Sequence, residues 1–134
     1  MGLVTTLSQK ELARIAGLAY EGETLNIMLC SVGLTGYTTE SLVTDWETVE
    51  ISGNGYVRYS VVIGAGAYDS VDGRYEMPSI DAPFTATGAG YSFDRIIIWI
   101  EGASYIHSMI VENPNITMAA GQTLTYRVQV VTDD

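Results

Sequence analysis

The spacing of hydrophobic and polar residues changes along the chain, and it predicts a helix followed by strands. Ser8 and Glu11 have the spacing of a capping box, which marks the start of a helix. Leu7 stands where it could pack against Leu12 as a hydrophobic staple. Apolar residues then recur at helical spacing, at Leu12, Ile15, Ala16 and Ala19. We therefore expect a short amphipathic helix over residues 9–19, with this apolar stripe docked on its own domain rather than on a partner.

From Thr24 onward the spacing is typical of strands. Residues 24–32 form a compact apolar run with the length of a buried strand. Over residues 56–63 and 123–130 apolar side chains alternate with polar ones, as in half-buried antiparallel strands. The side chains expected to face inward are Val57, Tyr59, Val61, Ile63, Leu124, Tyr126, Val128 and Val130. Tyr56, Arg58 and Ser60 are expected on the outward face.

Residues 94–113 predict a β-hairpin that turns at Gly102-Ala103-Ser104, and its first strand is apolar on both faces and therefore central. Pro114 is expected to end the second strand because proline has no N–H for a ladder bond. Residues 36–51 suit one or two helical turns or an ordered loop, and residues 64–90 are expected to be rich in loops. The chain is thus predicted to be one domain, residues 1–134, mainly β, with an antiparallel β-sandwich or jelly-roll-like fold and a short N-terminal helix.

Composition narrows the classes of function. The hydrophobic fraction of 47% and the charged fraction of 16% are those of an ordered globular chain. A formal net charge of −10 disfavours binding to nucleic acid and to anionic membrane surfaces. Residues 1–8 lack the basic and apolar regions of a secretory signal, so we expect no export. Cys30 is the one cysteine, and its apolar neighbours predict a buried side chain rather than a nucleophile.

Residues that could carry chemistry are few. Asp69, Asp72 and Glu76 form the best acidic group, but their spacing does not match the calcium loop, and a solvated turn is the favoured interpretation. His107 is the one histidine, and a structural or interface role is favoured for it over catalysis. We expect no catalytic residues, no metal, no cofactor and no enzymatic activity.

Tyrosines near glycines and charged loops are the remaining feature. Such rings make good platforms for sugars or protein partners, because they bury area at small entropic cost. In the stretch "ISGNGYVRYSVVI", a glycine turn leads into a strand that carries an arginine between two tyrosines. This pattern favours a scaffold strand with an interface over a site of chemistry. The candidate interface residues are Tyr56, Arg58, Tyr68, Tyr75 and Tyr91.

The order of these segments resembles a group of small virion proteins of tailed bacteriophages, from about Leu7 to the end of the chain. The resemblance lies in the leading helix and in the segments "LNIMLCSVGL", "GNGYVRYSV", "APFTATGAGYSFDRIIIWIEG" and "IVENPNITMAAGQTLTYRVQVV". The aromatic and arginine strand at residues 55–58 matches one of its motifs, and Pro114, Gly121 and Thr123 match a second.

This resemblance implies a structural role in a virion, with assembly in the host cytoplasm. The leading hypothesis is a capsid decoration or cement protein that binds the major capsid protein as a homo-oligomer, with a trimer favoured. The alternative is a tail-fibre or tail-tip adhesion module that binds a host-surface glycan or receptor, using Tyr68, Tyr75 and the Asp69/Asp72 loop. Neither role involves nucleic acid or a membrane.

Overall fold

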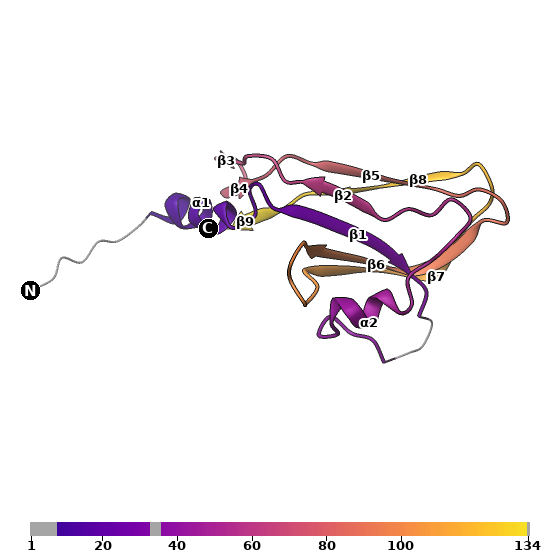
Figure 1. The fold of residues 1–134 in the computed structure, drawn as a ribbon. Helices are drawn as coiled ribbons and strands as arrows, with labels where there is room; N and C mark the ends of the chain where they lie inside the picture. Colours follow the sequence, from indigo (N-terminus) through magenta and orange to yellow (C-terminus); the bar gives the residue numbers. More distant parts are fainter. Residues whose placement is uncertain (1–7, 33–35, 134) are drawn as a thin grey trace, which may run out of the picture. The chain divides into compact units, whose positions relative to one another are not determined.

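The computed structural model describes residues 8–32 and 36–133, and it is mainly β, with antiparallel sheets and a short N-terminal helix (Figure 1). The fold class predicted from the sequence is therefore confirmed. Its elements are α1 (Gln9–Leu18), β1 (Thr24–Cys30), α2 (Val43–Glu47), β2 (Tyr59–Val62), β3 (Ala67–Asp69), β4 (Arg74–Glu76), β5 (Ile80–Thr85), β6 (Tyr91–Ile100), β7 (Ser108–Met118), β8 (Thr123–Val128) and β9 (Val131–Asp133).

These elements form two compact units. Among the described residues, the first unit contains residues 8–23, 62–80 and 127–133, and the second contains residues 24–32, 36–61 and 81–126. The chain therefore passes from the first unit to the second and back twice. The expectation of a single domain over residues 1–134 stays a prediction.

A four-stranded sheet with the order β2-β1-β6-β7 is the centre of the second unit. β1 pairs antiparallel with β6, from Leu25 opposite Ile100 to Cys30 opposite Arg95. β6 also pairs antiparallel with β7, so the predicted hairpin and the central position of its first strand are confirmed. One helical turn, α2, lies in residues 36–51 as expected, and its Val43 and Trp46 pack in a core cluster beside Trp99.

β7 does not end at Pro114, and that prediction was wrong. The strand continues to Met118, but its pairing with β6 shifts: Arg95 faces Val111, whereas Phe93 faces Ile116. Residues 112–115 therefore bulge out opposite Asp94. Because proline cannot donate to the ladder, the pairing is interrupted at this position and resumes beyond it.

A second layer, the antiparallel pair β5–β8, covers the four-stranded sheet of the second unit. Aromatic rings join the layers: Phe84 of β5 and Phe93 of β6 each contact Tyr126 of β8, with ring centroids 6.5 and 6.4 Å apart. The alternation predicted for residues 123–130 is confirmed, although the strand ends at Val128. This unit is thus a two-layer sandwich with an aromatic interior.

The first unit contains a small sheet with the order β3-β4-β9. Residues 64–90 are rich in loops as predicted, but three strands, β3, β4 and β5, also lie there. β3 and β4 are each three residues long and joined by a tight turn, in which Gly73 has a φ of 68° that favours glycine. Strands this short give too little alternation to be recognised in a sequence.

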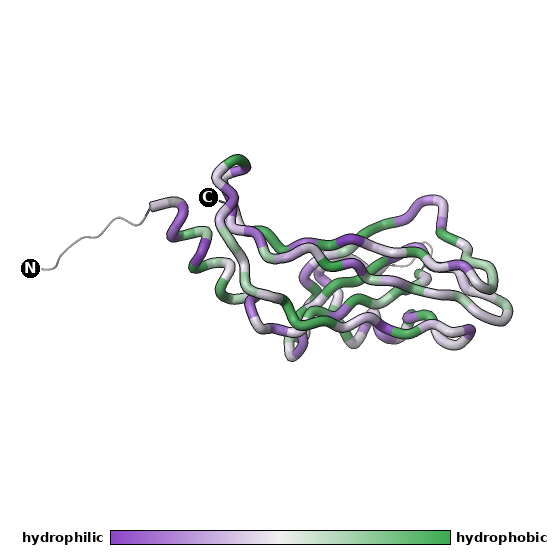
Figure 2. The backbone as a smooth tube through the Cα atoms, turned by 90° about the horizontal axis from the view of Figure 1, so that it is seen from above, coloured by the Kyte–Doolittle hydropathy of each residue, from purple (hydrophilic) through white to green (hydrophobic). Residues whose placement is uncertain are grey.

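Helix α1 begins as predicted, but it packs through a different face. Ser8 accepts a hydrogen bond from the Glu11 N–H at 3.2 Å, which confirms the N-cap, whereas the Glu11 side chain pairs with Arg14 instead of completing the box. Leu7, the expected staple residue, lies outside the described residues. The buried residues of the helix are Ala13 and Gly17, and the predicted stripe is exposed. Figure 2 shows apolar and polar residues alternating along this helix.

Small residues explain this orientation, because they let the helix backbone approach the sheet closely. The Thr132 hydroxyl of β9 donates to the Ala13 carbonyl at 2.6 Å, and a Cβ atom added at Gly17 would overlap the Tyr75 ring of β4. Leucine or isoleucine would not fit in this space. The bulky stripe therefore faces away from the unit.

Replacing Gly17 by alanine tests this packing. In an isolated helix Gly17→Ala would stabilise by about 0.5–1 kcal/mol, but here the clash with Tyr75 should lower the free energy of unfolding by about 1–2 kcal/mol. Chemical denaturation of the wild type and the variant measures the difference. The double variant Gly17→Ala, Tyr75→Leu is the control that should recover part of the loss. A more stable single variant would contradict the packing.

Candidate functional site

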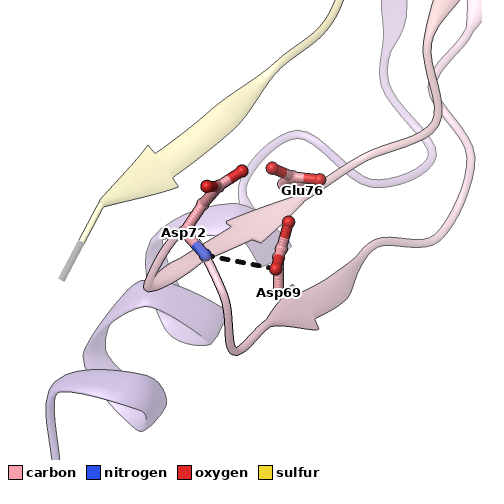
Figure 3. Close-up of side chains that lie close together, drawn as sticks. All are labelled: Asp69, Asp72 and Glu76. Atoms are coloured by element: carbon pink, nitrogen blue, oxygen red, sulfur yellow. Dashed lines mark hydrogen bonds between the residues drawn. The ribbon is translucent and has the colours of Figure 1, made fainter.

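The β3–β4 hairpin brings Asp69, Asp72 and Glu76 together, so that carboxylate oxygens of the three residues lie within 4.8 Å of one another (Figure 3). Asp69 ends β3, Asp72 lies in the turn, and Glu76 ends β4. Asp69 Oδ1 accepts hydrogen bonds from the N–H groups of Asp72, at 3.2 Å, and Val71, at 2.9 Å. These bonds favour the ionised carboxylate and lower the pKa of Asp69. Asp69 therefore stabilises the turn between β3 and β4.

Arg74 supplies positive charge to the same cluster. Its Nε lies 2.7 Å from Glu76 Oε1, and its Nη2 lies 3.6 Å from Asp72 Oδ2. Carboxylate oxygens are the ligands that Ca²⁺ prefers, but this guanidinium already pairs with two of the three groups. The geometry therefore supports an ion-paired turn, and the absence of a bound metal stays a prediction.

An open hollow of about 550 Å³ adjoins the cluster. Its lining residues are Ala65, Ala67, Tyr68, Asp69, Ser70, Glu76, Met77, Pro78 and Gln129. The Lys10 ammonium lies 5.2 Å from the centroid of the Tyr68 ring, and Gln129 Nε2 donates to the Met77 carbonyl at 2.9 Å. The hollow thus combines an aromatic ring, carboxylates and an amide, which together can contact a polar ligand.

Glu21 forms hydrogen bonds to the segments beside this hollow, and sequence reasoning missed this residue. Its Oε1 accepts from the Gly66 N–H and from the Tyr75 hydroxyl, both at 2.7 Å. The bond from Gly66 and then that from Tyr75 lower the pKa of Glu21. Since the partners lie 45 and 54 positions away in the chain, no local pattern could reveal this contact.

The candidate interface residues do not form one exposed surface. Tyr75 and Tyr91 are buried, at 8% and 9% exposure, and Tyr56, Arg58 and Tyr68 are half-buried. Tyr68 and Tyr75 belong to the first unit and the other three to the second. Tyr75 and Tyr91 therefore present little surface to a partner, and an interface role for the five residues stays a prediction. Of the group, Tyr68 is the tyrosine that lines a hollow.

The inward and outward assignment at the start of the 56–63 segment is also corrected. Tyr56 points inward, where its ring lies 6.3 Å from that of Phe84 and 5.9 Å from that of Tyr91, whereas Val57 is 73% exposed. The reason is that β2 begins only at Tyr59, so the alternation of the strand does not extend back to the glycine turn.

A buried polar network fixes Tyr56 and Arg58. The Tyr56 hydroxyl donates to Glu50 at 2.6 Å and accepts from the Leu29 N–H at 3.1 Å. The Arg58 guanidinium contacts both Glu50 oxygens, at 2.6 and 3.0 Å, and lies 5.0 Å from the centroid of the Trp99 ring. Tyr56 and Arg58 of the "GNGYVRY" stretch thus serve the scaffold.

Cys30 and His107 were the remaining residues considered for chemistry. Cys30 is fully buried as predicted, and burial raises the pKa of its thiol to about 12, so the nucleophilic thiolate is not formed near neutral pH. His107 is exposed just before β7, where its Nδ1 lies 3.1 Å from the neighbouring Ser108 hydroxyl. The contact between His107 and Ser108 includes no carboxylate, so it is not a nucleophile–base–carboxylate arrangement.

Comparison of the chain with protein-family models, with curated protein sequences and with solved structures found no match. Within the described ranges, no helix has the length and apolar character needed to cross a membrane.

Removing the charge of Glu50 should destabilise the protein. In Glu50→Gln the half-buried Arg58 loses its charged bidentate partner, and an NH2 group replaces one of the two oxygens that accept from Tyr56 and Arg58, which should cost about 2–3 kcal/mol of unfolding free energy. Glu47 pairs with the same arginine at 3.1 Å but its side chain is 41% exposed, compared with 15% for Glu50. Glu47→Gln is therefore the matched control, and it should cost below about 1 kcal/mol. Equal losses in urea denaturation would show that the network does not act as described.

Stability should also fall at alkaline pH because of Tyr56. Burial, and then the hydrogen bond to Glu50, raise the pKa of this phenol above its ordinary value near 10. The folded state therefore holds the proton more tightly than the unfolded chain, so this contribution is complete below about pH 10 and is lost as the pH rises further. Unfolding free energies measured from pH 8 to 11 should decline above pH 10, with a smaller slope in Tyr56→Phe. An identical slope in the exposed-site control Tyr105→Phe and in Tyr56→Phe would contradict this assignment.

Proposed function

We propose that this chain is a non-enzymatic structural protein of a tailed-phage virion, which binds the major capsid protein and reinforces the head lattice. It works as a homo-oligomer, with a trimer as the favoured state. Rigid β layers present small contact surfaces to several neighbours at once. Repetition of a modest contact over a lattice gives a firm attachment through avidity, with no single tight interface.

The observation that carries this proposal is the exposure of large apolar side chains on both units. These side chains, each 45% to 91% exposed, are Leu12, Ile15, Leu18, Leu42, Val57, Val62, Val71, Tyr105 and Val111. Exposed apolar residues that lie side by side, as Leu42 and Tyr105 do across their β-bridge, are typical of protein contact sites. A lattice component needs more than one contact surface, because it must touch several neighbours.

The polar side chains of the scaffold support the same function. Glu50 and Glu21, which could have served as acids or bases, are used to hold strands together. The net charge of −10 keeps the remaining surface well hydrated. The resemblance to small virion proteins is the reason for proposing a capsid as the partner in these contacts.

A tail-fibre or tail-tip adhesion module is the second candidate, and the hollow beside β3 and β4 favours it. Tyr68, Asp69 and Glu76 all line this hollow. The tyrosine ring can stack on a sugar ring, and the two carboxylates can accept hydrogen bonds from the sugar hydroxyls. Tyr75, which this hypothesis also used, is buried and bonded to Glu21, so it does not contribute.

The copy number of this protein in purified particles of the encoding phage separates the two functions. Quantitative mass spectrometry should give a ratio to the major capsid protein near one, or a simple fraction of one, if the chain decorates the head. A few copies per particle would overturn the decoration function and favour adhesion at the tail. Absence of the chain from particles would overturn both.

A further inference from the structure

We propose that Asn54 is a site of spontaneous deamidation, and that the fold delays this reaction by bonding the Asn54 side chain to the loop at residues 87–90. Asn54 is followed directly by Gly55, and both residues are exposed. The inference concerns the covalent chemistry of the chain itself, so it does not rest on the proposed function. It assigns a modification site to the turn that precedes β2.

The reaction needs no partner other than water. The backbone nitrogen of Gly55 loses its proton to hydroxide and forms a bond to Cγ of Asn54. The bond from Cγ to the side-chain nitrogen then breaks, and that nitrogen takes a proton from water and leaves as ammonia. Water opens the resulting succinimide ring at either of its two carbonyl groups, which leaves aspartate or isoaspartate at position 54. Glycine favours the ring closure, because it has no side chain to hinder the attacking nitrogen.

The other three asparagines of the chain lack this combination of features. Asn26 and Asn115 each precede an isoleucine, whose branched side chain hinders the attack. Asn113 precedes Pro114, which has no N–H to be deprotonated. Asn26 is also buried, at 3% exposure. The reaction is therefore expected at Asn54, and the other three positions serve as references within the same chain.

Two hydrogen bonds attach Asn54 to the loop at residues 87–90. Its side-chain nitrogen donates to the Gly90 carbonyl at 2.8 Å, and its backbone carbonyl accepts from the Thr87 N–H at 2.8 Å. Gly88 lies against the same side chain, because a Cβ atom added to this glycine would be 3.0 Å from Asn54 Oδ1. The loop thus contacts the side-chain amide at both its nitrogen and its oxygen.

This attachment opposes the ring closure. Before the Gly55 nitrogen can bond to Cγ, the Asn54 side chain must turn back onto its own backbone, which breaks its bond to Gly90. The backbone of the turn is also fixed in the left-handed region, with φ of 75° at Gly53, 53° at Asn54 and 82° at Gly55. Deamidation should therefore proceed from molecules in which the turn has opened locally, and its rate should follow the population of that open form.

Deamidation would remove the attachment permanently. Aspartate has nearly the shape of asparagine, but its carboxylate only accepts hydrogen bonds, so an oxygen would face the Gly90 carbonyl oxygen with no proton between them. The effect would reach the interior, because Tyr91 follows Gly90 and its ring lies 5.9 Å from that of Tyr56. Since ammonia is lost, the change is irreversible and accumulates with the age of the molecule.

Incubation of the purified full chain at mildly alkaline pH, in buffer and in urea, tests the proposal. Peptide mass spectrometry measures how fast each asparagine is converted to the acid. We expect Asn54 to be converted under both conditions, at least about tenfold more slowly in the folded chain than in urea. The other three asparagines should stay intact over the same time. Equal rates at Asn54 in buffer and in urea would overturn the delay, and an intact Asn54 in urea would overturn the site.

Gly88→Ala tests the attachment in the folded chain, because its methyl group would displace the Asn54 side chain. Gly102→Ala is the matched control: Gly102 also has a positive φ, of 91°, but nothing lies within 4 Å of its Cβ position. Circular dichroism establishes that both variants fold. In buffer, Gly88→Ala should deamidate several-fold faster than the wild type, and Gly102→Ala at the wild-type rate. Equal rates in the two variants would overturn the role of the attachment.

Asn54→Asp carries the product of the reaction from the start, and it tests the consequence. Its midpoint of urea unfolding should lie below that of the wild type, because the bond to Gly90 is lost. Folded wild-type chain that has been aged until Asn54 is converted should shift in the same direction. An unchanged midpoint in Asn54→Asp would overturn the structural effect of deamidation.

Discussion

The second unit depends on the hydrogen bonds that the Glu50 carboxylate accepts. The carboxylate accepts hydrogen bonds from the Tyr56 hydroxyl and the Arg58 guanidinium, while the same hydroxyl accepts a bond from the N–H of Leu29, near the end of β1. A charged group at 15% exposure is costly to desolvate, so its stabilising effect depends on all of these bonds being present together. They join the glycine turn, the segment after α2 and a central strand. Trp99 completes the arrangement, since the guanidinium stacks on its ring.

Elements with a strong local pattern could be predicted from the sequence. The N-cap at Ser8, the buried run of β1, the β6–β7 hairpin and the alternation of β8 all follow from spacing that extends over several residues. The short strands β3 and β4 could not be found, because three residues carry almost no periodicity. The bulge in β7 was also not predicted. Pro114 correctly indicated a break in the pairing, but it did not indicate that the strand resumes after the break.

The candidate site was less predictable than the fold, because its contacts are long-range. Hydrophobicity alone suggested that the bulky side of α1 would be buried, yet the closeness of Tyr75 makes alanine and glycine the residues that fit. Proximity in sequence did identify the acidic turn, and the structure adds the Arg74 pairing that defines its charge. The position of Tyr105 could not be foreseen, since its backbone forms a β-bridge with Leu42, which is distant in the chain.

The bulge in β7 has a consequence for copies of this chain held close together. β2 and β7 are the two edges of the four-stranded sheet, and an unpaired edge is a template on which another molecule can add a strand. β2 is four residues long, which limits such pairing, and the outward bulge at residues 112–115 interrupts the row of backbone groups along β7. Both features disfavour edge-to-edge strand pairing between crowded copies. Contacts between molecules are directed to side chains, which can be specific, rather than to exposed backbone, which is not.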